Sequence, residues 1–154
     1  YETPARTVAV IGGHGGMGAL MARMFGDLGH LVLVVGLGTE LGAGTSFSIL
    51  STLNEAYKAA QLNGKKLTAG HAYYLATRGT ARAMYIEDKV GSIAPGMEAD
   101  LVVLNMKSTP IIEYRMQFAQ DFHEALFIQM TLGDDRAVQA TYVAGELRYQ
   151  KATH

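Results

Sequence analysis

The sequence predicts an α/β fold, in which a parallel β-α-β unit is followed by helices and a small patch of late strands. Three patterns predict it: two β-branched runs enclose a glycine-rich loop near the start, helical periodicity dominates the middle, and a strand-like run near the end contains a tight turn. Hydrophobic residues make up 49% of the 154 residues and charged residues 18%. A chain this apolar should fold, and we expect one compact domain.

The first 35 residues predict the β-α-β unit. Thr7 to Gly12, TVAVIG, is typical of a buried strand in a parallel sheet. Met17 to Leu28 place their apolar residues at the spacing of an amphipathic helix, and Gly29 follows as a stop signal. The run from His30 to Val35, HLVLVV, predicts the second buried strand.

Three helices are expected in the middle of the chain. Thr45 or Ser46 can cap a helix that extends to Gln61, which we expect to cover the two strands together with the helix before it. Thr68 begins another helix, with His71 at the position where a capping box would hold Glu or Gln. A short helix should occupy Thr80 to Tyr85.

The last third of the chain predicts a mixture of strands and helix. The run from Asp100 to Asn105 follows a turn and predicts a strand. The run from Ile111 to Leu132 predicts a helix that ends at Gly133. The final run predicts two strands around a tight Ala144-Gly145 turn. These late strands should form a mixed or antiparallel patch.

A glycine motif lies between the first strand and the first helix. Gly13, Gly15 and Gly18 fit G-x-G-x-x-G, in which glycines let the backbone approach a pyrophosphate at a helix N-terminus. The alternative is a tight strand-to-helix turn without a ligand. The acid expected to bind the ribose is replaced by Gly36, and the nearest acid is Glu40. We therefore expect at most weak binding of NAD(H) or a similar small nucleotide.

Composition excludes several classes of protein. The chain has no cysteine, which excludes disulfides and thiolate zinc ligands. Its formal net charge of −1 lacks the excess of basic residues that is typical of nucleic-acid-binding proteins. No apolar stretch approaches the ~20 residues of a membrane-spanning helix. We expect a cytoplasmic protein without a nucleic-acid or membrane partner. Because the chain begins with Tyr1, we expect it to be processed, trimmed or cut from a longer protein.

The first of two resemblances covers Arg6 to Val35. The stretch VAVIGGHGGMGALMARMFGDLGHLVLVV resembles the opening of prephenate or arogenate dehydrogenases, which are Rossmann enzymes that use a nicotinamide dinucleotide. The resemblance implies that Gly13, Gly15 and Gly18 cradle the pyrophosphate. The second half of that enzyme's sheet and its helical substrate domain have no counterpart in the sequence.

The second resemblance begins at Gly36 and continues to the end of the chain. GLGTELGAGTSFSILSTLNEAYKAAQLNGKKLTAGHAYYLAT, GSIAPGMEADLVVLN and MTLGDDRAVQATYVAGELRYQ are similar to the C-terminal part of guanine deaminases, zinc-dependent amidohydrolases with a β/α barrel. The resemblance implies that an aspartate at the end of the eighth strand binds metal and transfers protons. Here that position is Glu40, a candidate catalytic residue that is altered from the family's aspartate.

The resemblance also implies metal-binding histidines that the sequence lacks. In that family an H-x-H pair and two further histidines come from earlier barrel strands, whereas the five histidines of this chain show no such spacing. Catalytic zinc needs about three converging protein ligands. We therefore assign no metal ligand and do not expect this chain to retain zinc.

Other candidate residues have simpler interpretations. His14 could contact a phosphate, but a solvent-facing turn residue is favoured. Asp121, His123 and Glu124 are favoured as a solvated helix face, because neighbours one and three apart converge poorly. Asp134 and Asp135 resemble a structural connection in guanine deaminases.

Two functional hypotheses remain open. The first is a chimera or fragment, Rossmann-like over residues 1–35 and guanine-deaminase-like over residues 36–154, with no complete catalytic site. The fold would then be a hybrid of a partial barrel and a Rossmann unit. The alternative is part of a zinc-dependent guanine deaminase. In that family the late strands pair with an N-terminal segment that we do not find, so we also expect a homo-oligomer.

Overall fold

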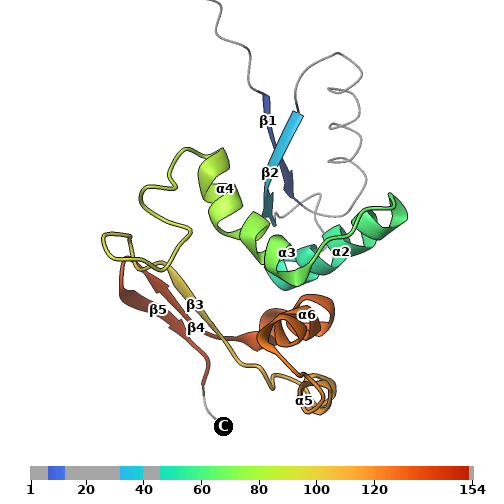
Figure 1. The fold of residues 1–154 in the computed structure, drawn as a ribbon. Coiled ribbons are helices and arrows are strands. Elements are labelled where there is room, and N and C mark those ends of the chain that lie inside the picture. The colour runs from blue at the N-terminus through green and yellow to red at the C-terminus, as the bar shows by residue number, and fades with distance from the viewer. Residues whose placement is uncertain (1–6, 13–31, 40–45, 153–154) are drawn as a thin grey trace, which may run out of the picture.

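The structure is a computed structural model that describes residues 7–12, 32–39 and 46–152, with side chains described from residue 37 onward within these ranges. Figure 1 shows the elements along the chain. In order they are β1 (Thr7–Gly12), β2 (Val32–Gly38), α2 (Ile49–Leu62), α3 (Ala69–Ala76), α4 (Arg78–Ala83), β3 (Leu101–Leu104), α5 (Pro110–Met116), α6 (Phe122–Leu132), the 3-10 helix η1 (Asp135–Ala137), β4 (Val138–Val143) and β5 (Glu146–Gln150).

β1 and β2 form a parallel pair. Thr7 pairs with Val32 and Gly12 pairs with Gly38, with one irregularity in the register between Ala9 and Val10. The parallel pairing was predicted, but the predicted end of the second strand at Val35 was wrong. β2 continues through Gly36 and Gly38 because their backbone groups pair with the last residues of β1. The helix expected between the strands lies outside the described residues.

The middle helices agree with the sequence in number and differ at their ends. Thr68 caps α3 as predicted, since its hydroxyl oxygen accepts a hydrogen bond from the His71 N–H at 3.3 Å. The helix predicted from Ser46 begins at Ile49 instead, because the Ser46 hydroxyl accepts the N–H of Ser48 at 3.0 Å in a turn before the helix. The short helix predicted for Thr80 to Tyr85 occupies Arg78–Ala83.

The predicted single helix from Ile111 to Leu132 was wrong, because the chain breaks it into α5 and α6. Thr109 caps α5, whose first residue is Pro110. Asp121 caps α6, accepting the Glu124 N–H at 2.8 Å, while the Glu124 carboxylate accepts the Gln120 N–H at 2.9 Å. This variant of the capping box, in which Glu124 bonds the residue before the N-cap rather than the N-cap itself, begins a new helix inside the periodic run.

The late strands form an antiparallel sheet in the order β3-β4-β5, which confirms the small late patch. Ala144 and Gly145, between β4 and β5, have φ angles of 50° and 80°. Positive φ at both central residues is the requirement of a type I′ hairpin turn. The Ala144 N–H donates to the Asp100 carboxylate at 2.8 Å, which holds the turn against the start of β3.

Helix packing joins the two sheets into one body. The main cluster of buried residues connects β2, α2, α3, α6 and η1; its members are Leu37, Leu50, Leu53, Ala69, Ala72, Met130 and Ala137. In Figure 1, β1 and β2 lie on one side of α2 and α3, and α6 lies on the other. The strands are therefore covered by α2, as predicted, and also by α3 and α4.

No helix in the described ranges is long and apolar enough to cross a membrane.

Candidate functional site

The carboxyl end of β2 precedes the residue that the sequence singles out as catalytic. Leu37 is 7% exposed, and its carbonyl oxygen accepts a hydrogen bond from the Thr80 hydroxyl at 3.3 Å. The same hydroxyl lies 2.8 Å from the carbonyl oxygen of Leu75, at the end of α3. Thr80 therefore ties the end of β2 to the junction of α3 and α4.

The predicted site residues themselves lie outside the described residues. This holds for Glu40, which follows β2, and for Gly13, Gly15 and Gly18 of the predicted nucleotide loop. Their roles therefore stay predictions, as does the role of His14. Gly36, the position where a ribose-binding acid was expected, lies within β2 and pairs with Val10.

The described residues do not form a zinc site. They contain no group of three or more His, Cys, Asp or Glu side chains that could hold a metal ion. The described histidines, His71 and His123, are exposed on different helices. Because catalytic zinc takes about three protein ligands around one open position, this part of the chain does not fit the metal.

Asp121, His123 and Glu124 are exposed, as predicted for a solvated helix face. Sequence reasoning nevertheless missed that the two acids form the capping box of α6. The signal was present as D-x-x-E immediately before an apolar run. Both carboxylates are thus committed to backbone N–H groups.

Asp134 has the structural role that the resemblance implied. Its carboxylate accepts the Arg136 N–H at 2.9 Å and forms an ion pair with the Arg136 guanidinium at 2.6 Å. The guanidinium hydrogen bonds hold the pKa of Asp134 below its ordinary value. The pair fixes the turn of η1 before β4.

The Tyr73 hydroxyl and the Gln129 side chain are among the buried polar groups of the described residues. The Tyr73 hydroxyl finds no hydrogen-bond partner among the described residues, and burial raises the pKa of Tyr73 to about 12. Gln129 is 0% exposed, and its amide donates to the carbonyl oxygen of Asn105 at 3.3 Å.

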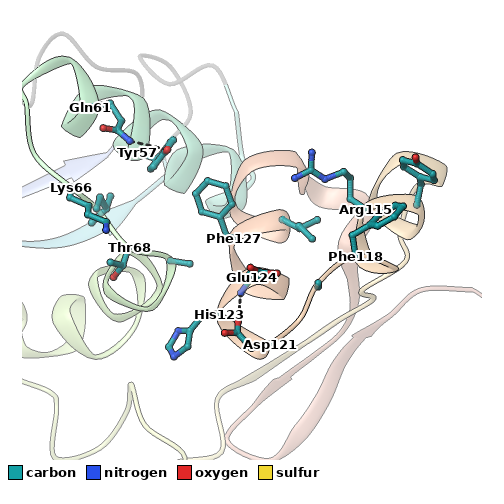
Figure 2. Close-up of a pocket in the computed structure, with 15 residues that line it drawn as sticks. Tyr57, Gln61, Lys66, Thr68, Arg115, Phe118, Asp121, His123, Glu124 and Phe127 are labelled. Carbon is teal, nitrogen blue, oxygen red and sulfur yellow. Dashed lines mark hydrogen bonds between the residues drawn. The ribbon is translucent and has the colours of Figure 1, made fainter.

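A cavity of about 930 Å³ lies between α2, the loop after it, α5 and α6. Figure 2 shows Tyr57 and Lys66 on one side, Arg115 and Phe118 on the other, and Phe127 between them. Sequence analysis missed this cavity, because its walls come from helices that are distant in the sequence and meet only through packing. Its size is in the range of sites for small molecules.

The comparisons with known proteins decide between the two resemblances. The sequence model of the Amidohydrolase family matches residues 21–148, which is most of the chain. The chain belongs to the amidohydrolase family. The match begins inside the stretch that we interpreted as Rossmann-like and crosses the boundary placed between residues 35 and 36.

Relatives of this amidohydrolase chain include several guanine deaminases. It is 48% identical to guanine deaminase of Escherichia coli over 117 residues, which cover 76% of this chain and 27% of that protein. It is 31% identical to human guanine deaminase over 121 residues, or 73% of this chain and 27% of the relative. The chain therefore spans about a quarter of the length of these relatives.

The chain is also similar to solved structures of guanine deaminases. E. coli guanine deaminase superposes with a TM-score of 0.74 and 46% identity, over 79% of this chain and 28% of that one. The guanine deaminase from Bradyrhizobium japonicum gives a TM-score of 0.69 and 27% identity, over 85% of this chain and 34% of that one.

The structural neighbours correct the Rossmann part of the predicted fold class. The fold is a mixed α/β arrangement with a small antiparallel sheet, and its neighbours are amidohydrolases. None of these comparisons supports a segment related to prephenate dehydrogenase, a chimeric origin or a NAD site. The likeness that suggested them rests on glycine spacing around a strand and a helix, which also suits other α/β folds.

Proposed function

We propose that this chain is part of a zinc-dependent guanine deaminase, a purine aminohydrolase that converts guanine to xanthine. The observation that carries the proposal is the 48% identity over 117 residues to a guanine deaminase whose backbone superposes with a TM-score of 0.74. Sequence and fold thus point to the same enzyme, which was our alternative hypothesis.

In such an enzyme, this chain would supply the catalytic residue that follows the end of β2. The resemblance assigns a metal-binding, proton-transferring aspartate to the position of Glu40. The Thr80 hydrogen bond to the Leu37 carbonyl and the buried Leu37 side chain hold the preceding strand in place. Such anchoring matters because catalytic groups tolerate little displacement.

Glu40 itself departs from the family pattern. Its side chain is longer than aspartate by one carbon–carbon bond of ~1.5 Å. A misplacement of about 1 Å in a catalytic group can lower the rate ~100-fold. Since the described residues do not form a zinc site, we expect the isolated chain neither to hold one zinc per molecule nor to deaminate guanine.

A hybrid enzyme tests the proposal. Residues 36–152 of this chain replace the matching segment of E. coli guanine deaminase, in two versions that carry either Glu40 or Glu40→Asp. We expect the Glu40→Asp hybrid to convert guanine to xanthine, and the Glu40 hybrid to be slower by about 100-fold. Zinc content and the circular dichroism spectrum of each hybrid establish that it folds and is loaded.

The controls separate folding from chemistry. Glu40→Ala in the same hybrid removes the carboxylate and should abolish turnover, while the unaltered E. coli enzyme gives the reference rate. If the Glu40→Asp hybrid folds and carries zinc but leaves guanine unchanged, the segment does not function in a guanine deaminase. Equal rates for Glu40 and Glu40→Asp would contradict the role assigned to that position.

A further inference from the structure

We propose that the cavity between α2, α5 and α6 binds a small planar aromatic monoanion of the aromatic carboxylate class. The cavity is lined by the second half of α2, whereas Glu40 precedes the first turn of that helix. None of the residues that line the cavity belongs to β2, so the proposal does not depend on the role of Glu40 and stands whether or not the chain functions in a deaminase.

Aromatic side chains form the walls of this cavity. The Tyr57 and Phe127 rings pack edge to face with centroids 5.3 Å apart, and the Tyr114 and Phe118 rings do so at 5.2 Å. Phe118 and Tyr114 are 60% and 56% exposed, so apolar ring surface remains open to solvent. A planar apolar ligand would cover this surface, and stacked or edge-on rings stabilise such a contact.

Two cations at the cavity remain available for an anion. Lys66 and Arg115 form no ion pair within the described part of the chain, whereas Lys58 pairs with Glu55 and Arg136 with Asp134. In Figure 2 the Arg115 guanidinium extends from α5 toward Phe127. A guanidinium matches a carboxylate through two parallel N–H···O bonds, which favours this anion over a spherical one.

The acids of the cavity limit the charge of the ligand. Asp121 and Glu124 also line it, and their carboxylates accept the backbone N–H groups of the α6 capping box. Two cations and two carboxylates give a lining with no net charge when His123 is neutral. A multiply charged ligand such as a nucleoside triphosphate would meet repulsion from both acids, so a single negative charge beside Arg115 fits best.

The test compares 2-naphthoate with 2-naphthamide, which has a similar shape and no charge. Ligand fluorescence is followed as the full chain is titrated, since the protein has no tryptophan. We expect saturable binding of 2-naphthoate at high micromolar concentration, and binding of 2-naphthamide at least ten-fold weaker. Equal affinity for the two compounds, or no saturation below millimolar 2-naphthoate, would overturn the proposal.

Variants locate the site. Arg115→Gln should weaken 2-naphthoate binding about ten-fold and leave 2-naphthamide unchanged. Lys66→Gln should weaken it less, because the ammonium is a point charge without the planar fork. Lys65→Gln is the matched control, since this neighbouring lysine does not line the cavity. Circular dichroism verifies folding, and unchanged 2-naphthoate binding by folded Arg115→Gln would refute the assignment.

Discussion

Gly133 ends α6 at a place where the structure leaves no room for a side chain. A Cβ at this position would overlap the carbonyl oxygen of Gln129 and lie 2.9 Å from Leu50 Cδ1 and 3.0 Å from Gln129 Oε1. The residue has φ −75° and ψ 150°, which alanine adopts without strain. The cost of Gly133→Ala therefore arises from packing alone.

We expect Gly133→Ala to lower the free energy of unfolding by about 3 kcal/mol, the upper end of overpacking costs. The upper end applies because the clash involves backbone, and because moving the Gln129 side chain would disturb its hydrogen bond to the Asn105 carbonyl. Urea denaturation followed by circular dichroism measures it, and with a slope of ~2 kcal/mol/M the midpoint should fall by about 1.5 M.

Gly70→Ala is the matched control within α3. A Cβ there would meet only His123, at an ordinary 3.8 Å. Because glycine in a helix is less stable than alanine, Gly70→Ala should raise the free energy of unfolding by about 0.5 kcal/mol. If Gly133→Ala lowers the free energy of unfolding by less than about 0.5 kcal/mol, the packing of α6 against α2 described above is wrong.

Four further predictions follow from local features. Asp121→Ala removes the acceptor of the α6 capping box and should cost about 1 kcal/mol of unfolding free energy, measured in urea; an unchanged midpoint would argue for one continuous helix. Burial raises the pKa of Tyr73 to about 12, so the folded state favours the neutral form of this side chain. This stability is complete below the ordinary tyrosine pKa of 10 and is lost as the pH rises from there through 12. Ultraviolet titration should show a late-ionising tyrosine that is absent from Tyr73→Phe. Ala144→Asn should stabilise the hairpin by up to about 1 kcal/mol in thermal unfolding, because asparagine tolerates the positive φ that alanine resists. The predicted self-association should appear in light scattering as a dimer or larger species, since β3 and β5 are the edges of the sheet among the described residues and β5 is exposed along its whole length; a monomer at high micromolar concentration would contradict it.

Local signals in the sequence predicted several elements correctly. The alternation of residues around Ala144-Gly145 predicted the final hairpin, and the Thr68 hydroxyl caps α3 where the pattern placed it. These features depend on residues within a few positions of one another, so a short window of sequence contains the necessary information. The guanine deaminase likeness also came from the sequence, since long matching strings are specific.

The errors arose where local patterns were ambiguous. G-x-G-x-x-G after a strand suggested a Rossmann unit, yet the family match places residues from 21 onward in an amidohydrolase. Continuous apolar periodicity concealed the break between α5 and α6, although the capping residues Asp121 and Glu124 marked it. The second strand was predicted to end at Val35, whereas Gly36 and Gly38 extend β2 by pairing with β1.

The sequence by itself determined the hairpin turn, the Thr68 cap of α3, the absence of cysteine chemistry and the relationship to guanine deaminases. Only the tertiary structure determined that Thr80 anchors the end of β2, that Gly133 has no space for a Cβ, and that Lys66 and Arg115 border one cavity with Phe127. The physical reason is distance along the chain. Capping and turn formation involve neighbouring residues, while a close approach or a cavity depends on packing between segments tens of residues apart, which no local pattern specifies.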